Sequence, residues 1–376
     1  MNNLKTATVV LALALFCGGQ ALAEENLIPD GVIYEVKPGD TLETIAETFL
    51  GKDRTGREIA AATAAARAQY PDLADEKMLE NLQPGQKLLL PVKLTTRKIS
   101  EFLVADQLDF PEAPFYSKKE DLLYYVEWGG DRIWKYKDGQ KILFMENAKD
   151  DGPCGLDQDK DGNLWVALYS SGKMALYSPE GKQLKLFEEG PEGRFVGPND
   201  LVVDKSGGAF FTDSGNFEDD WVSGREAGKV YYITPDDRIL LLDKGISYAN
   251  GIVLSPAGDK LYVNEHRKNR ILVYDVDGEK IGNRRVLIDL DNKCLSAADV
   301  CYEVGPDGMT RDGVGNLWVA HYHTGRMLKI SPEGRVLQNL YLPLGDTPTN
   351  ATLSPDEKFI YVSEASTGSL LKLPVE

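Results

Sequence analysis

The sequence is poor in histidine, in cysteine and in long hydrophobic segments. It holds three histidines and four cysteines in 376 residues. No spacing among the cysteines matches a structural zinc site, which excludes a zinc-ribbon or zinc-finger class. After the first 23 residues, no segment approaches the roughly 20 consecutive apolar residues that a membrane-spanning helix needs. We therefore expect no membrane span.

Positive charge is also in short supply. The chain has 42 lysines and arginines against 59 aspartates and glutamates, a formal net charge of -17. An acidic surface repels phosphate backbones and anionic lipids, so we expect no nucleic-acid partner. The surplus is compatible with cation binding, although an ordinary solvated surface has the same composition. The length allows two or more domains and a sizeable core.

Residues 1–23 have the pattern of a cleaved signal peptide. Lys5 precedes an apolar run over 9–16, and Ala21-Leu22-Ala23 is a small-x-small cleavage site. Phe16 is bulky for the position before a lipidated cysteine, so Cys17 does not favour a lipoprotein. We expect an exported protein that is periplasmic or associated with the cell wall.

Three cysteines remain after this cleavage. Cys294 and Cys301 bracket the segment CLSAADVC, and export permits disulfides, so we predict that they pair. Two free thiols are the alternative. Cys154 would then be single, which is typical of a buried small apolar residue.

The segment YEVKPGDTLETIAETFLG, from Tyr34, predicts a strand, a turn and a helix with apolar residues at helical spacing. A second helix over about 56–69 follows, and then the closing segment LQPGQKLLLPV. Residues 33–92 resemble a lysin motif (LysM) domain. The resemblance implies binding of peptidoglycan or another N-acetylglucosamine glycan by Gly39, Asp40, Thr41 and Leu42, with 82–84 nearby. A small αβ spacer without a ligand is the alternative.

Residues 93–110 form a predicted bridge, and 111–376 are almost entirely strands and turns. Six related units start at residues 111, 152, 197, 248, 305 and 347, about 40 to 57 residues apart. Repeats of that length made of short strands indicate propeller blades. We predict a mainly β fold, a six-bladed β-propeller after a small α+β LysM-like domain; five or seven blades are the alternatives. Residues 98–104 should complete the blade of the last strand, 369–373, because an open edge is unfavourable.

The units differ chemically at their first positions, which should ring one mouth of the central channel. These positions hold Glu112, Cys154, Asn199, Asn250, Asp307 and Asn350. Carboxylate and amide oxygens suit one divalent cation, Ca²⁺ or Mg²⁺ first, with Mn²⁺ or Zn²⁺ as alternatives. Singly, each is also an ordinary turn residue in sequences such as Pro-Asp-Gly.

Five segments in order carry a second resemblance: PEAPFY, CGLDQDKDGNLWVA, GPNDLVVD with FTDSG, YANGIVLSPAGDKLYV and PDGMTRDGVGNLWVAHYHTGRMLKISPEG. The chain is similar over 111–374 to the senescence marker protein/gluconolactonase/luciferin-regenerating enzyme family of six-bladed propellers. The resemblance implies a catalytic divalent metal, Ca²⁺ first, held by Glu112, Asn250 and Asp307. Asn199 would contact the substrate or a metal-bound water, and Arg194 would contact the substrate. The chain departs from the family at Ala113, usually glycine, and at Phe115, usually tryptophan.

His321 and His323 lie two apart in a predicted strand and should face the same side. We predict that His323 contacts the substrate. A zinc-binding His-x-His pair or a surface histidine is the alternative.

The implied reaction is hydrolysis of a lactone or a related ester, with Asp307 as both ligand and general base. A non-catalytic propeller that binds partners in the cell envelope is the main alternative. A synthase or lyase is a third hypothesis.

Overall fold

The computed structural model describes residues 32–36, 40–49, 56–67, 73–90, 99–221, 223–291 and 303–375. The chain divides into two compact units, Met1–Phe102 with Lys293–Asp299 and Leu103–Asn292 with Val300–Glu376. The predicted signal peptide and the predicted Cys294–Cys301 disulfide lie outside the described residues. Within the described residues, no helix has the length and hydropathy needed to cross a membrane.

The first unit pairs two strands in an antiparallel sheet beside three helices. Its elements are β1 (Val32–Glu35), α1 (Leu42–Phe49), α2 (Gly56–Ala66), α3 (Glu76–Glu80), β2 (Lys87–Leu90) and the 3-10 turn η1 (Ile99–Glu101). The strands align Val32 with Leu90 and Glu35 with Lys87. The order strand, two helices, strand agrees with the prediction, and α3 is an additional short helix.

The start of helix α1 is capped by two reciprocal hydrogen bonds that involve Thr41, one of the predicted glycan-binding residues. The Thr41 backbone N–H donates to Thr44 Oγ1 at 2.9 Å, and the Thr44 N–H donates to Thr41 Oγ1 at 3.1 Å. These bonds satisfy amide groups that the first helical turn leaves without partners. Thr41 therefore has a local structural role.

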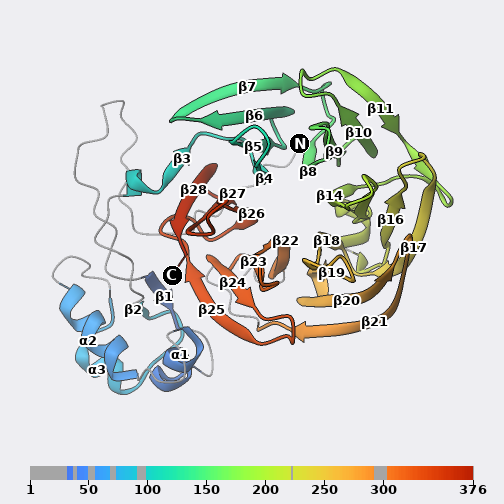
Figure 1. Ribbon diagram of the computed structural model, residues 1–376. Coiled ribbons are helices and arrows are strands. Elements are labelled where there is room, and N and C mark those ends of the chain that lie inside the picture. Colours follow the sequence, from blue (N-terminus) through green and yellow to red (C-terminus); the bar gives the residue numbers. More distant parts are fainter. Residues whose placement is uncertain are drawn as a thin grey trace, which may run out of the picture. The chain divides into compact units, whose positions relative to one another are not determined.

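The second unit is a six-bladed propeller, as predicted. Each blade is a four-stranded antiparallel sheet, and in Figure 1 the sheets radiate from a central axis. From the innermost strand outward, the blades are β4 (Pro111–Ser117), β5 (Leu122–Glu127), β6 (Arg132–Lys137) and β7 (Gln140–Glu146); β8 (Pro153–Gln158), β9 (Leu164–Leu168), β10 (Lys173–Tyr177) and β11 (Gln183–Phe187); β14 (Pro198–Val203), β15 (Ala209–Asp213), β16 (Gly228–Ile233) and β17 (Ile239–Ile246); β18 (Ala249–Leu254), β19 (Lys260–Glu265), β20 (Arg270–Asp277) and β21 (Lys280–Asp289); β22 (Gly305–Arg311), β23 (Leu317–Tyr322), β24 (Arg326–Ile330) and β25 (Val336–Tyr341); β26 (Pro348–Leu353), β27 (Phe359–Glu364), β28 (Ser369–Pro374) and β3 (Leu103–Ala105).

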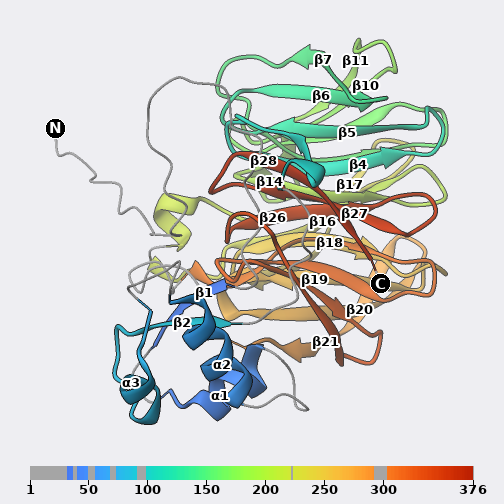
Figure 2. The same cartoon turned by 90° about the vertical axis from the view of Figure 1, so that its left-hand side faces the viewer.

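Three smaller elements complete this unit. The hairpin of β12 (Glu189–Gly190) and β13 (Gly193–Arg194) follows β11, the 3-10 turn η3 (His266–Lys268) follows β19, and the helical turn η2 (Phe217–Trp221) follows β15. Figure 2 shows η2 projecting beyond the edges of the strands.

Two strand contacts close the ring of blades. Innermost strand β26 packs beside β4, so the first and last blades are neighbours. Strand β3 pairs with β28, with Leu103 opposite Leu371 and Ala105 opposite Leu370. The predicted closing segment is therefore present, at 103–105, and it covers the β28 edge that would otherwise be open.

Every innermost strand has a break in its register near its start. The breaks lie between Glu112 and Phe115, Pro153 and Gly155, Pro198 and Leu201, Ala249 and Ile252, Pro306 and Met309, and Pro348 and Asn350. Pro-Asp-Gly and Ala-Asn-Gly have the composition of turns, but they lie inside strands β22 and β18. A bulge re-aims a side chain, so it can turn each first-position residue toward the channel.

Glycines beside these bulges allow neighbouring innermost strands to approach. A Cβ at Gly251 would lie 2.5 Å from the Asp307 carbonyl oxygen, and one at Gly308 would lie 2.1 Å from Asn350 Cγ. Both distances are far below van der Waals contact. Gly251 and Gly308, which follow Asn250 and Asp307, therefore allow adjacent blades to lie close together. This places the Asn250 and Asp307 side chains around one channel.

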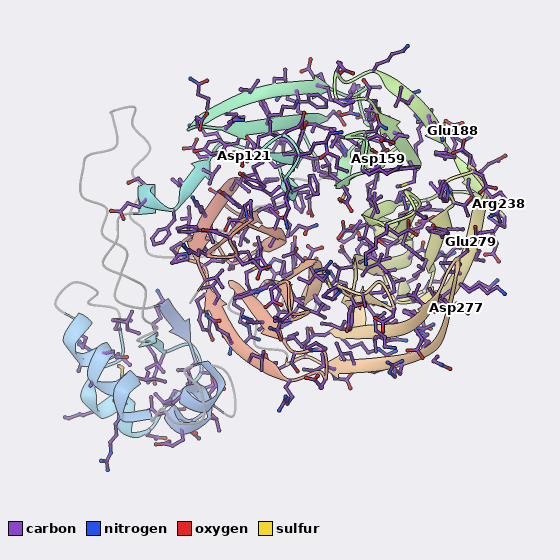
Figure 3. The ribbon with its side chains drawn as sticks, in the orientation of Figure 1. Asp121, Asp159, Glu188, Arg238, Asp277 and Glu279 are labelled. Carbon is purple, nitrogen blue, oxygen red and sulfur yellow. The ribbon has the colours of Figure 1, made fainter. Side chains whose placement is uncertain are left out.

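Apolar clusters fill the spaces between blades, and charged residues gather at the rim. Trp165 and Trp318 are buried, as expected of packing residues. On the outer rim, Arg238 Nη2 lies 2.6 Å from Glu279 Oε1, which joins the outer turns of two successive blades (Figure 3). Packing of the blades against one another thus fixes the ring on which the site is built.

Candidate active site

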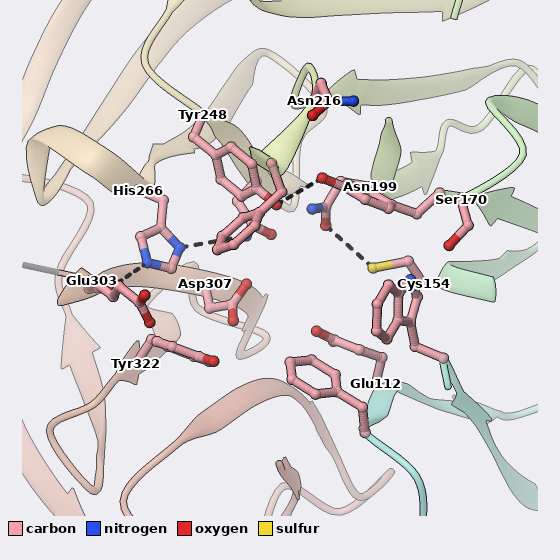
Figure 4. Close-up of a pocket in the computed structure, with 15 residues that line it drawn as sticks. Glu112, Cys154, Ser170, Asn199, Asn216, Tyr248, His266, Glu303, Asp307 and Tyr322 are labelled. Atoms are coloured by element: carbon pink, nitrogen blue, oxygen red, sulfur yellow. Dashed lines mark hydrogen bonds between the residues drawn. The ribbon is translucent and has the colours of Figure 1, made fainter. Parts of the chain in front are cut away.

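Five of the six first-position residues line one pocket of about 490 Å³ where the innermost strands begin. They are Glu112, Cys154, Asn199, Asn250 and Asp307. In Figure 4, the carboxylates of Glu112 and Asp307 point toward the middle of this pocket from different blades. The repeated position in the sequence therefore becomes a ring of side chains in space.

Asn350, the sixth first-position residue, has different contacts. Its Nδ2 lies 3.5 Å from Asp200 Oδ2, and its Oδ1 accepts from the Ala351 N–H at 2.8 Å. Asn350 and Asp200 line a smaller cavity along the innermost strands together with Asp157. The sixth blade therefore contributes to the channel and not to the pocket of the other five.

The two pocket carboxylates have strongly perturbed acidity. Burial raises the pKa of Glu112 well above its usual range, and the charges of Asp307 and Asp200 raise it further. Burial also raises the pKa of Asp307, with the hydrogen bond from Asn250 opposing and the charge of Asp200 adding to the rise. Buried like charges favour protonation unless a cation balances them.

The donor set fits a hard divalent cation, with one condition. Within the described residues, no group of three or more histidine, cysteine, aspartate and glutamate side chains could hold a metal ion. Glu112 and Asp307 therefore need amide oxygens beside them, which Asn250 and Asn199 carry. Asn250 lies close enough to Asp307 to oppose the rise of its pKa, so the amide and the carboxylate face the same part of the pocket.

His266, which was not among the predicted site residues, contacts Asn250. Its Nδ1 lies 3.5 Å from Asn250 Nδ2, and its Nε2 lies 2.9 Å from the Glu303 carbonyl oxygen. Burial lowers the pKa of His266 to about 4, so the ring is neutral at neutral pH. A neutral imidazole with one nitrogen on Glu303 can accept a hydrogen bond from Asn250 at the other.

Cys154 is a buried free thiol, as predicted. Its Sγ lies 3.6 Å from Asn199 Oδ1. Burial raises the pKa of Cys154 well above its usual range, and the Glu112, Asp307 and Asp200 carboxylates raise it further. The thiol is therefore protonated and acts as a weak donor that orients the Asn199 amide.

Main-chain carbonyls of the ring residues are held from neighbouring blades. Asn264 Nδ2 donates to the Asp307 carbonyl, and Thr212 Oγ1 donates to the Asn250 carbonyl at 2.7 Å. Thr349 Oγ1 donates to the Pro111 carbonyl at 2.8 Å, next to Glu112. The backbone at Asp307, at Asn250 and just before Glu112 is thus held by a buried side chain from another blade.

Two predicted substrate contacts lie outside the pocket lining. Arg194 is on β13, its side chain is 66% exposed, and it lies 3.7 Å from Glu188. His323 Nε2 lies 3.1 Å from Glu303 Oε2, so it reaches the pocket through Glu303. Of the predicted glycan-binding residues, Gly39 lies outside the described residues, whereas Asp40, Thr41 and Leu42 are at the start of α1.

The prediction that His321 and His323 face the same side is wrong. Strand β23 ends at Tyr322, and His323 has a φ of 59°, which breaks the alternation. His321 is fully buried with Nε2 2.9 Å from Asn269 Oδ1, whereas His323 contacts Glu303. The two rings therefore have separate partners.

Most of the pocket wall is aromatic, and its residues are not among those predicted from the sequence. Trp128, Tyr169, His266 and Tyr322 stand at or just after the end of the second strand of their blades. Because the first two strands are antiparallel, that end lies beside the start of the innermost strand. The sequence could have indicated these residues, because each occupies the position at or just after the end of the second predicted strand of its unit.

Comparison with known proteins agrees with this architecture. The family model described as the SMP-30/Gluconolactonase/LRE-like region matches residues 78–189 and 184–366, and a LysM domain model matches 34–56. A gluconolactonase of Zymomonas mobilis is 26% identical over 280 residues, 69% of this chain and 78% of the relative.

Two solved structures show the same fold. A gluconolactonase of Xanthomonas campestris superposes with a TM-score of 0.62 at 19% identity, covering 74% of this chain and 91% of the other. A calcium-binding protein, regucalcin, of Agrobacterium tumefaciens gives 0.60 at 19% identity, covering 73% and 93%.

Proposed function

Because the chain belongs to the SMP-30/gluconolactonase/LRE-like family, we propose that it is a divalent-metal-dependent hydrolase of a lactone or a related ester. The observation that carries the proposal is the convergence of Glu112, Asn250 and Asp307 on one pocket. The gluconolactonase of Zymomonas mobilis, which spans the same region, supports this reaction class.

Glu112, Asn250 and Asp307 would hold the cation, with Ca²⁺ as the first choice and Mg²⁺, Mn²⁺ or Zn²⁺ as alternatives. Hard oxygen donors favour Ca²⁺, and the related regucalcin structure is described as calcium-binding. When bound, the cation supplies Lewis-acid polarisation of the ester carbonyl. Two buried carboxylates with raised pKa values are the arrangement that such a cation would stabilise.

Asp307 would also take the proton from the attacking water. The water oxygen bonds to the carbonyl carbon, the bond from that carbon to the ring oxygen breaks, and the ring oxygen takes up the proton that Asp307 removed, so that the product is a hydroxy acid. Asn199, oriented by Cys154, would donate its amide N–H to the substrate. Asn264 and Thr212 would keep Asp307 and Asn250 in place while the substrate turns over.

The N-terminal domain would attach the enzyme to peptidoglycan. We assign 1–23 to a signal peptide, 33–92 to the LysM-like domain, 93–110 to the bridge and 111–376 to the propeller, with β3 (Leu103–Ala105) of the bridge completing the last blade. The LysM match over 34–56 supports glycan binding. An exported enzyme in the periplasm or at the cell wall follows from this assignment.

The test is proton release from a panel of lactones after chelation and after return of Ca²⁺, Mg²⁺, Mn²⁺ or Zn²⁺. We expect turnover to return with one cation in the wild type and to fall at least about 100-fold in Asp307→Asn. Asp161→Asn, in a distal turn, should behave as the wild type, because its side chain is 70% exposed. Stoichiometric cation binding without hydrolysis of any lactone would overturn the proposal and favour the non-catalytic binding protein.

A further inference from the structure

Aromatic side chains form much of the wall of the pocket that holds Glu112, Asn250 and Asp307. Six of them line it, and we call them the aromatic belt: Phe110, Trp128, Tyr169, Phe217, Tyr248 and Tyr322. Phe217 lies in η2 and the other five stand at or next to the ends of strands, in the same pocket as the polar ring of Glu112, Asn199, Asn250 and Asp307. A substrate that reaches the polar ring must therefore pass and contact aromatic faces and edges.

Contacts between neighbours hold the belt in place before any substrate binds. The Trp128 ring packs edge-on against Phe110 at 5.5 Å and Tyr169 at 6.4 Å between centroids. The Tyr169 and Tyr248 hydroxyls lie 3.0 Å apart, and Phe217 packs edge-on against Tyr248 at 6.0 Å. A preorganised wall of this kind loses little conformational entropy when it binds a flat apolar group.

The charges in the pocket are of one sign. Its lining holds the carboxylates Glu112, Glu303 and Asp307, and among the described lining residues there is no lysine or arginine. A divalent cation would balance two of these carboxylates and would leave no surplus to attract an anion. A phosphate or carboxylate on the substrate would therefore enter without a basic partner, at an electrostatic cost.

We propose that this site selects neutral lactones whose ester ring is fused to a flat aromatic or apolar ring, over polyhydroxylated and phosphorylated sugar lactones. This inference rests on the proposed hydrolase function. The aromatic belt offers stacking and edge contacts to the flat ring, while the polar ring below takes the ester. The hydroxyls of a sugar lactone would lose water against aromatic carbon without gaining equal hydrogen bonds.

The reaction on an aryl lactone balances without a further reactant. One water is consumed, its oxygen bonds to the acyl carbon, and the bond between that carbon and the ring oxygen breaks. The aryl oxygen takes a proton and becomes a phenol, and the new carboxylic acid releases one proton at neutral pH. The same proton-release assay therefore measures all substrates.

The experiment compares dihydrocoumarin, glucono-δ-lactone and the 6-phosphate of that sugar lactone on the full mature chain with its activating cation. Each kcat/KM is divided by the hydroxide-catalysed rate constant of the same lactone, which removes the difference in intrinsic reactivity. We expect the corrected value for dihydrocoumarin to exceed that of glucono-δ-lactone by at least about tenfold, with the phosphate lowest.

Variants test whether the aromatic belt causes the preference. Trp128→Leu and Phe217→Leu should each reduce the corrected ratio of dihydrocoumarin to δ-valerolactone about tenfold, mainly through KM. Phe115→Leu should not change this ratio, because Phe115 lines cavities deeper in the channel and at its opposite end.

A corrected preference for either sugar lactone, or an unchanged ratio in both belt variants, would overturn the inference and leave the hydrolase proposal standing. Hydrolysis of no lactone with any of the four cations would instead overturn the hydrolase proposal, and the inference with it.

Discussion

Asn264 lies behind Asp307, in the second strand of the neighbouring blade. It is fully buried, its Nδ2 donates to the Asp307 carbonyl, and within the described structure its Oδ1 has no hydrogen-bond partner. It also lies against Gly251, where an added Cβ would be 2.7 Å from Asn264 Nδ2. The Asn264 amide thus holds the backbone of Asp307 and packs against Gly251, the residue after Asn250.

Replacing Asn264 by leucine should therefore weaken cation binding while Glu112, Asn250 and Asp307 all remain. Groups that orient metal ligands typically contribute about 10- to 100-fold to metal affinity, so we expect Kd to rise by that factor in Asn264→Leu. Isothermal titration with Ca²⁺ or Mn²⁺ measures the change.

Asn316→Leu is the matched control, because Asn316 Nδ2 donates to Asp312 in a distal turn at 2.8 Å. It should lower the melting temperature and leave Kd unchanged. An equal rise of Kd in both variants would show that Asn264 acts only through general stability.

At this scale, the sequence identified the residues at repeated first positions but not their neighbours. Glu112, Asn250 and Asp307 could be aligned because each follows the same pattern in its unit. His266 and Trp128 could not, because their place at the pocket depends on which strand ends meet at the mouth. Arg194 looked equivalent to a substrate contact, but the β12–β13 hairpin places it beside Glu188 at the surface.

Among the elements, the distal turns have a recurring hydrogen-bonded form. Asp312 Oδ1 accepts from the Asn316 N–H at 2.8 Å, and Gly315 has a φ of 98°. Asp159 accepts from the Asn163 N–H at 2.9 Å, and Gly162 has a φ of 92°. Glycine is needed at this position because other residues rarely adopt such a φ. The motif Asp-x-x-Gly-Asn therefore closes a turn and is not a cation site.

The Asp312 turn predicts a defined dependence of stability on pH. Burial raises the pKa of Asp312, but hydrogen bonds from Asn316 and the charge of Lys329 outweigh it and hold the pKa below its usual value. A depressed folded-state pKa means that the stabilisation is present above the unfolded pKa of about 3.9 and is lost as the pH falls below it.

We expect Asp312→Ala to lower the free energy of unfolding by about 1–2 kcal/mol at pH 7, and the difference from the wild type to shrink below about pH 4. Urea denaturation across this pH range measures it. Asp161→Ala should change the stability by less than about 0.5 kcal/mol, because that side chain is 70% exposed. A difference that stays constant down to pH 3 would contradict the role of the carboxylate charge.

The blades and their closure were predictable because alternation and spacing repeat over the whole second unit. The bulges were not, because Pro-Asp-Gly and Ala-Asn-Gly favour turns as strongly as they favour an irregular strand. What decides between them is the contact of Gly251 and Gly308 with the next blade, which local sequence does not encode.

For the whole molecule, the proposed tether and the proposed hydrolase should be separable. We expect the mature chain to co-sediment with insoluble peptidoglycan and Asp307→Ala to do so equally, because Asp307 belongs to the propeller. Asp40→Ala, at the start of α1, should co-sediment several-fold less. Retention of Asp40→Ala equal to the wild type, or loss of retention in Asp307→Ala, would contradict this division of roles.

The pairing of strand β3 with β28 affects when the propeller can close during synthesis. Strand β3 precedes every other propeller strand in the chain, yet its partner β28 comes last. At about 5–20 residues per second, synthesis separates Ala105 from Leu370 by roughly 13 to 53 s. During that interval β3 has no β28 to pair with and the ring cannot close. Closure of the propeller therefore has to wait until the strands of all six blades have been synthesised.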